Sequence, residues 1–280
     1  MASRRSHTIG AIIPTMENAI FARGLQAFQE TLDDLGYNLL VSSTAYRPDV
    51  EAEQIRSLVA RGADGLLLIG YERNQAVYEY LERQTIPTLL AWAYSKDSAR
   101  PSIGFDNRAS MRALAEEVIS MGHRHIAVIS GIVEGNDRAA GRLQGIRDAM
   151  VSNGLDLSDL PVIETPYEID NGSNAFEDLW GLITKPTVVM CGNDVLAVGA
   201  IQRAIEMGIR IPEDVSITGF DDLELARIVT PRLTTVHVPH RQMGHEAARE
   251  LIQMVEGKSQ GKSQRLECAL EMRESLRAIG

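Results

Sequence analysis

Cysteine is scarce in this sequence. Its 280 residues include two cysteines, Cys191 and Cys268, which lie far apart and without the spacing of metal ligands. Cys191 stands at the end of an apolar run. The pattern argues against a disulfide framework and predicts a reduced, cytoplasmic chain.

Long apolar runs are also missing. No stretch of the sequence is long enough to span a bilayer. The segment Met1–His7 is short and basic, and it leads straight into the strand-like Thr8–Pro14 without the apolar core and cleavage site of a signal peptide. We expect neither membrane insertion nor export.

An excess of basic residues is absent as well. The chain has 28 Lys and Arg against 38 Asp and Glu, a net charge of -10. A protein that binds nucleic acid by itself usually presents a basic face and a high pI. The sequence therefore does not predict autonomous DNA binding.

The common nucleotide-binding and nucleophile motifs are not found. No G-x-G-x-x-G follows the first strand, and no G-x-S-x-G occurs. Gly257-Lys258-Ser259 and Gly261-Lys262-Ser263 lack both the upstream glycine of a P-loop and a preceding strand. The sequence predicts neither an enzyme nor a cofactor.

Histidine forms two groups that could suggest a metal site. His123 and His125 make a His-x-His pair, and His237, His240 and His245 follow later. His123 falls in a turn, and neither group has a recognised ligand spacing. Structural or solvent-facing roles are therefore predicted, with no metal site.

Short apolar runs alternate with amphipathic helical stretches, which is typical of a parallel α/β sheet. The expected strands are Ile9–Ile13, Tyr37–Val41, Leu66–Ile69, Thr88–Leu90, Ile126–Ile129, Val162–Thr165, Val188–Met190 and Val215–Phe220. The expected helices are Ala19–Leu35, Val50–Arg61, Gln75–Arg83, Arg138–Met150, Asn174–Ile183 and Asp194–Met207. An irregular stretch at Lys96–Ser102 separates two such series, so we predict two doubly wound lobes.

Ligands of open parallel sheets bind beyond the carboxyl ends of the strands, where helix N-termini present free amide groups. Carboxylates, amides and aromatic rings are frequent at these predicted ends, including Trp92, Asp106, Tyr167, Asn193 and Asp221. Carboxylates and amides pair with hydroxyl groups, and rings offer flat apolar faces. The pattern predicts a site for a small polar ligand where the strand ends of two lobes face each other.

Four strings carry a family resemblance. Residues 122–131 read GHRHIAVISG, and residues 142–145 read RLQG. Residues 193–200 read NDVLAVGA, and residues 211–222 read IPEDVSITGFDD, followed by PRLTTV at residues 231–236. In this order they resemble the GH(R/K)xIAxIxG, RxxG, NDxxAxGA and IPxDxSxxGFDD strings of LacI/GalR transcriptional regulators. The resemblance extends over the chain from about Thr8 onward.

The resemblance implies a type I periplasmic-binding-protein-like fold, with two lobes between which the chain crosses three times. The first lobe would comprise residues 7–118 and 240–268, and the second residues 119–239 and 269–280. Family members also carry an N-terminal helix-turn-helix headpiece and a hinge helix, neither of which is seen in this sequence. Met1–His7 resembles the end of the linker that follows the hinge. The resemblance further implies a homodimer that binds operator DNA through the missing headpiece.

Residue by residue, the resemblance assigns effector contacts to Asp106, Arg142, Asn193 and Asp221. Tyr167 and Trp92 are candidates for stacking on the ligand, and Phe21 belongs to the apolar stretch Ala19–Phe21 at the floor of the pocket. Many sugar-binding relatives are polar at that floor. We expect a sugar, a sugar acid or a similar small effector.

Each of these residues also has a purely structural interpretation. Asp106, Asn193 and Asp221 could cap the helices that follow them, and Arg142 could be an exposed helix residue with a weak surface ion pair. Tyr167 and Trp92 could be rim or core aromatics. Adjacent side chains diverge, so Asp222 is expected to be a cap or to face solvent while Asp221 binds the ligand.

A different function on the same fold is an exported sugar-binding protein that serves a transporter. The missing signal peptide and the regulator-like strings argue against that alternative, although a mature chain could have lost its signal. A monomer would favour the exported protein, and a dimer the regulator.

Overall fold

The computed structural model describes residues 6–17 and 19–279. They form two compact units. The first, here called the first lobe, is the chain up to Asp106 together with Pro239–Glu267, and the second lobe is Asn107–Val238 together with the chain from Cys268 on. The expected linker remnant lies mostly in residues 1–5, outside the described residues.

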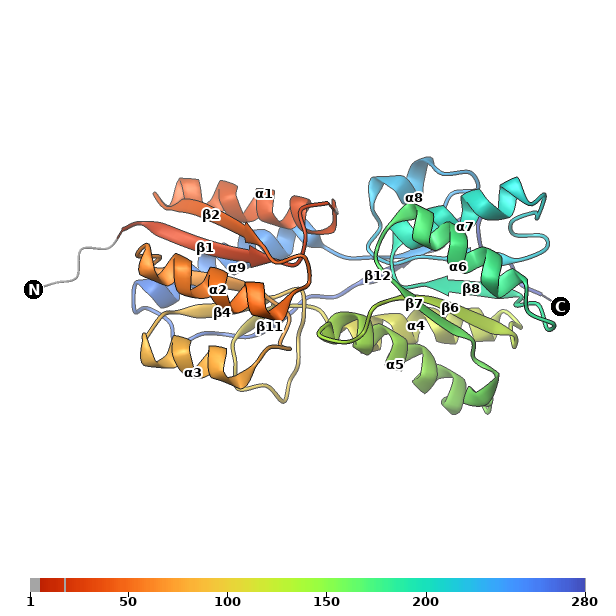
Figure 1. Cartoon of the computed structure of the whole chain (residues 1–280), viewed down its shortest axis with the longest axis horizontal. Coiled ribbons are helices and arrows are strands. Elements are labelled where there is room, and N and C mark those ends of the chain that lie inside the picture. Colours follow the sequence, from red (N-terminus) through yellow and green to blue (C-terminus); the bar gives the residue numbers. More distant parts are fainter. Residues whose placement is uncertain (1–5, 18, 280) are drawn as a thin grey trace, which may run out of the picture. The chain divides into compact units, whose positions relative to one another are not determined.

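The first lobe is a parallel sheet with helices on both faces (Figure 1). Its strands are β1 (Thr8–Ile13), β2 (Asn38–Ser43), β3 (Gly65–Ile69), β4 (Thr88–Ala91), β5 (Ser102–Gly104) and β11 (Gln264–Arg265), in the spatial order β11-β5-β4-β3-β1-β2. Its helices are α1 (Ala19–Asp34), α2 (Pro48–Ala60), α3 (Gln75–Arg83) and α9 (His240–Val255). Side chains alternate along β3, so Leu66 and Leu68 pack with Ile55 of α2 and Leu81 of α3, while α1 and α9 pack against each other.

The second lobe repeats this architecture. Its parallel strands are β6 (Ile126–Gly131), β7 (Val162–Thr165), β8 (Val188–Cys191) and β9 (Ser216–Thr218), in the order β7-β6-β8-β9, and β10 (Thr235–His237) pairs antiparallel with β12 (Ala269–Glu271). Its helices are α4 (Asn107–Ser120), α5 (Asp137–Ser152), α6 (Ile169–Trp180), α7 (Asp194–Glu206) and the short α8 (Glu224–Ile228), with a 3-10 turn at Leu157–Asp159. Helices α4 and α5 pack together, and so do α6 and α7. The predicted doubly wound α/β class is confirmed.

Helix ends follow the local sequence. Asn136 and Asn193 precede α5 and α7, and the side-chain oxygen of each accepts a backbone N–H of the first turn. Gly122 and Gly208 follow α4 and α7 with φ of 99° and 73°, a conformation that disfavours any residue with a Cβ. Each of these helices therefore ends just before a glycine that can adopt this conformation.

Helix α6 differs from its prediction. It begins five residues earlier than expected, at Ile169, and ends at Trp180 instead of Ile183. Gly172 has a low intrinsic helix propensity, but it is needed inside α6 because a Cβ there would lie 2.3 Å from the Leu196 carbonyl oxygen of α7. Ile183 is fully exposed, although its position in the sequence continues the apolar spacing expected of the buried face of a helix. Close packing of two helices, rather than local preference, places this element.

Candidate functional site

Four of the seven predicted site residues belong to one edge of the second sheet. Because β6 to β9 are parallel, their carboxyl ends share that edge. Tyr167 follows β7, Asn193 follows β8 and Asp221 follows β9, while Arg142 lies on α5, the helix after β6. The second lobe thus brings these four residues to the place where open α/β sheets bind ligands.

Arg142 is held by neighbours from two other elements. Its Nη1 donates to Asn107 Oδ1 at 3.0 Å, and its Nη2 donates to the Tyr167 hydroxyl at 2.8 Å. The guanidinium carbon lies 4.9 Å from the centre of the Phe220 ring, within the range of a cation–π contact. Only 7% of the residue is exposed, so the alternative of a surface arginine is wrong. The guanidinium is fixed before any ligand arrives.

Tyr167 depends on a glycine. A Cβ at Gly131, the last residue of β6, would lie 2.2 Å from the Tyr167 ring. The ring therefore lies against the bare backbone at the end of β6, and its hydroxyl reaches Arg142. Any larger residue at 131 would displace both the ring and the hydrogen bond.

Asp221 is buried in a left-handed backbone conformation. Its φ is 102°, and 2% of the residue is exposed. Burial raises the pKa of the Asp221 carboxyl to about 6, and the charge of Arg142 opposes that rise. Non-glycine residues rarely adopt such a φ, and those that do gather at functional sites. An acid held in this state is suited to accept hydrogen bonds from a ligand.

Asp222 does not face solvent, so that expectation is wrong. The Arg273 and Arg227 guanidiniums donate to its oxygens at 2.6 Å and 2.7 Å, and His237 Nδ1 lies at 2.9 Å. Burial acts to raise its pKa, but these hydrogen bonds outweigh burial and lower the pKa to about 2. With φ of 102° and 52° at successive residues, the backbone sends the two carboxylates to different partners. Asp222 ties β10 and the segment after β12 to the turn after β9.

Asn193 caps the helix that follows it, as its structural interpretation predicts, and its amide nitrogen stays unpaired among the described residues. Its Oδ1 accepts the Leu196 N–H at 2.9 Å, so it caps α7. Its Nδ2 is buried and finds no hydrogen-bond partner in the described part of the chain. Leaving a buried donor unpaired costs about 1–3 kcal/mol. That cost disappears if a ligand oxygen accepts from Nδ2.

Phe21 and Trp92 belong to the first lobe and contact each other. Their ring centres are 5.4 Å apart and their planes are inclined at 62°, and the centre of the His240 ring lies 6.5 Å from that of Trp92. A Cβ at Gly24 would lie 2.4 Å from the Trp92 ring, which is 2% exposed. Trp92 has φ of 59°, an unusual value at the end of β4. Asp106 ends the first of the two segments that form this lobe, and it is half-buried and lies directly before α4.

Sequence reasoning missed two members of the second-lobe group. Asn107 holds Arg142, and Phe220 lies under its guanidinium. Asn107 stands directly after Asp106 at a predicted strand end, and Phe220 stands within the GFDD string, so position alone could have nominated both. Only their contacts with Arg142 reveal what they do.

His123, the first histidine of the predicted His-x-His pair, has structural partners. His123 lies 2.9 Å from the Thr187 hydroxyl and 3.0 Å from the Arg277 carbonyl oxygen, and burial lowers its pKa. Among residues 6–17 and 19–279, no group of His, Cys, Asp and Glu could hold a metal ion. Over the same residues, no helix is long and apolar enough to cross a membrane.

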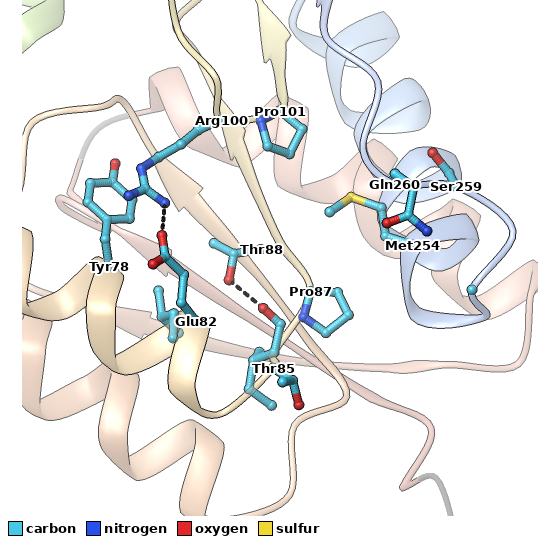
Figure 2. A pocket seen from close by; sticks show the side chains of 13 residues that line it. Tyr78, Glu82, Thr85, Pro87, Thr88, Arg100, Pro101, Met254, Ser259 and Gln260 are labelled. Atoms are coloured by element: carbon cyan, nitrogen blue, oxygen red, sulfur yellow. Dashed lines mark hydrogen bonds and ion pairs between the residues drawn. The ribbon is translucent and has the colours of Figure 1, made fainter.

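A separate pocket of about 330 Å³ lies in the first lobe, and no predicted site residue lines it. Figure 2 shows Arg100 over the Tyr78 ring, 3.5 Å from its centre, with an ion pair to Glu82 at 3.1 Å. Pro87 and Pro101 of its wall precede β4 and β5, so the pocket lies at the amino ends of the strands. It is therefore distinct from the edge at which sheets of this class bind ligands.

Comparison with known proteins identifies relatives along nearly the whole chain. A periplasmic binding protein-like domain matches residues 115–276. The HTH-type transcriptional repressor PurR of Klebsiella pneumoniae (strain 342) is 31% identical over 267 residues, which cover 94% of this chain and 77% of the repressor.

Solved structures agree with the sequence match. The transcription regulator GntR from Chromobacterium violaceum has a TM-score of 0.89 and 27% identity, covering 96% of this chain and 98% of its own. The complex of the transcriptional regulator CelR with cellobiose has a TM-score of 0.84 and 25% identity, covering 98% of this chain and 86% of its own.

Proposed function

This chain belongs to the LacI/GalR family of transcriptional regulators, and on that premise we propose that it binds a small effector and couples binding to operator recognition. The relatives are repressors and regulators rather than enzymes. Operator binding is assigned to the helix-turn-helix headpiece that the family carries before this domain. The same relatives favour a regulator over an exported binding protein.

The observation that carries the proposal is the prearranged group at the edge of the second sheet. Arg142 is fixed by Asn107 and Tyr167, and Asp221 is buried within range of its charge. Asn193 adds a buried amide donor that lacks a partner among the described residues. Such a set offers acceptors and donors at fixed positions, which is the requirement for reading hydroxyl groups with little ordering cost.

A sugar or sugar acid is the proposed effector. Carboxylate and amide groups bind hydroxyls in pairs, and a guanidinium binds either hydroxyls or a carboxylate. The bound cellobiose of the CelR neighbour supports a carbohydrate. The proposal also assigns effector contacts to Asp106, Phe21 and Trp92 of the first lobe, on the strength of the family resemblance.

A ligand panel tests the function directly. Glucose, cellobiose, gluconate, glucuronate, adenine and guanine are added in turn, and unfolding is followed by differential scanning fluorimetry. A ligand at a hundred times its Kd stabilises the native state by about 2.7 kcal/mol. We expect one carbohydrate to raise the unfolding temperature and to be recovered unchanged. Steady turnover of the bound compound would overturn the regulator assignment.

Self-association is the second part of the proposal. In the second lobe, Ile205 at the end of α7 and Ile228 at the end of α8 are 56% and 75% exposed, and the two helices are in contact. Exposed apolar groups of this kind suit an interface between two copies, and a two-fold dimer would present two headpieces to a symmetric operator.

Sedimentation at micromolar concentration should show a dimer that Ile228→Glu weakens at least about tenfold, because a carboxylate would be desolvated in the interface. Val151 of α5 is also exposed, at 60%, and Val151→Glu is the matched control that should leave the dimer intact. A strictly monomeric wild-type chain at high concentration would instead favour the exported binding protein.

A further inference from the structure

We propose that Asp194 is a positioning residue of the effector site: its buried carboxyl group holds the turn that presents Asp221, without touching the effector itself. The proposal rests on the function proposed above, because it presumes that Asp221 binds the effector. It assigns a role to Asp194, the second residue of the NDVLAVGA string, for which the sequence predicts no function.

Asp194 is hydrogen-bonded to both ends of the turn after β9, through its backbone at one end and through its side chain at the other. Its backbone N–H donates to the Phe220 carbonyl oxygen at 2.9 Å, and its Oδ2 accepts the Leu223 N–H at 2.6 Å. Asp221 and Asp222 are the two residues between these anchors. A third bond, from the Thr235 hydroxyl to Asp194 Oδ1 at 2.6 Å, fixes the carboxyl group to β10. One side chain therefore links α7, the turn and β10.

The turn needs such a support because its backbone is disfavoured. Asp221 and Asp222 have φ of 102° and 52°, in the region that side chains with a Cβ rarely adopt. Residues stay in such conformations only where surrounding contacts determine them. A Cβ at Gly219 would lie 2.3 Å from Asp194 Oδ1, so the chain entering the turn also runs directly against the carboxyl group.

The position of the Asp194 side chain matters more than its charge. The residue is completely buried, and burial raises its pKa well above the usual value, with the Asp221 carboxylate raising it further. Its side-chain partners are a hydroxyl and a backbone amide, and among the described residues no cation bonds to it. An asparagine can serve both partners: its oxygen accepts from Leu223, and its amide donates to the Thr235 hydroxyl.

Ser275 provides the matched control. It lies in the same lobe, is completely buried, and also makes two hydrogen bonds to backbone: its hydroxyl accepts the Thr234 N–H at 2.8 Å and donates to the Ile217 carbonyl oxygen at 2.6 Å. These bonds tie the body of β9 to its neighbours and do not reach the Asp221 turn. A general loss of stability in the lobe would therefore follow Ser275→Ala as well as Asp194→Ala.

The experiment compares Asp194→Ala, Asp194→Asn, Thr235→Val, Ser275→Ala and Asp221→Ala. Calorimetry with the carbohydrate that stabilises the chain most in the panel is run at a temperature where circular dichroism shows each variant folded. Hydrogen exchange of the Leu223 amide is measured on the same samples without ligand.

We expect Asp194→Ala to lower affinity about ten- to a hundredfold and to speed exchange at Leu223, because the Leu223 end of the turn is released while the backbone bond to Phe220 remains. Asp194→Asn should stay within about twofold of wild type, Thr235→Val should lose about three- to tenfold, and Ser275→Ala should bind normally. If Asp194→Ala does not fold, the affinities of Thr235→Val and Asp194→Asn still test the inference. The inference fails if Asp194→Ala or Thr235→Val binds like wild type, if Asp194→Asn loses as much as the alanine variant, or if Ser275→Ala loses as much. A normal affinity of Asp221→Ala would instead refute the proposed site.

Discussion

Asp221→Ala is expected to weaken effector binding about ten- to a hundredfold while the second lobe remains folded. The substitution removes the buried carboxylate oxygens of Asp221. Ligand hydroxyls would then lack acceptors in a desolvated site, which costs about 1–3 kcal/mol of binding free energy. Calorimetry with the best carbohydrate of the panel measures the change. Asp178→Ala, which removes an exposed carboxylate from α6, is the control and should bind normally.

The same carboxyl group should reduce stability when no ligand is bound. Because burial raises the pKa of Asp221 from 3.8 to about 6, the folded state binds the proton more tightly than the unfolded state. The free energy of unfolding therefore falls as pH rises through this window, and the penalty is complete above about pH 6. Asp221→Asn should stabilise the ligand-free protein at pH 7 by on the order of 2–3 kcal/mol, and the gain should vanish below about pH 4.

Urea unfolding at the two pH values checks this expectation. A variant that is more stable and yet binds less tightly would show that Asp221 is kept for its ligand and not for the fold. If Asp221→Asn were less stable than wild type at pH 7, the carboxylate would have a structural role, and the assignment to the effector would lose its main support.

Asp222→Ala should have the opposite result, with a large loss of stability. It removes the completely buried side chain that accepts from Arg273, Arg227 and His237. Arg273 is only 12% exposed, and without Asp222 its charge would keep only the half-exposed carboxylate of Glu271, at the longer distance of 3.5 Å. Breaking a buried ion pair in this way costs about 3–5 kcal/mol. Urea unfolding of the variant measures the loss.

The pH dependence gives this prediction a second readout. The pKa of Asp222 is lowered from 3.8 to about 2, so its contribution is present above about pH 4 and is lost as pH falls towards 2. Wild type should lose stability across that window, whereas Asp222→Ala should lose less. Arg227 is 56% exposed, and Arg227→Ala, the control on the same cluster, should cost about 0–1 kcal/mol. A variant Asp222→Ala as stable as wild type would show that the cluster contributes little.

Asp221 and Asp222 show why the sequence predicted part of the candidate site and not all of it. Tyr167, Asn193 and Asp221 each follow a predicted strand, which was enough to place them at one edge of the sheet. The carboxyl ends of parallel strands lie at the same edge however the side chains pack. The roles of Asp221 and Asp222 could not be separated in this way. Their difference comes from two successive left-handed residues and from Arg273, which is 51 residues away.

The sequence by itself determined the α/β class, the parallel sheets, the limits of α1, α2, α3, α5 and α7 to within two residues, and the strand ends that carry the candidate residues, whereas the bounds of α4 and α9 were not predicted. These features follow from periodicity and from capping residues, which act over a few neighbouring positions. Only the tertiary structure decided the start of α6, the hydrogen bonds from Arg142 to Asn107 and Tyr167, and the burial of Asp222. These depend on contacts between segments remote in sequence, and no local pattern of residues encodes which of them will meet.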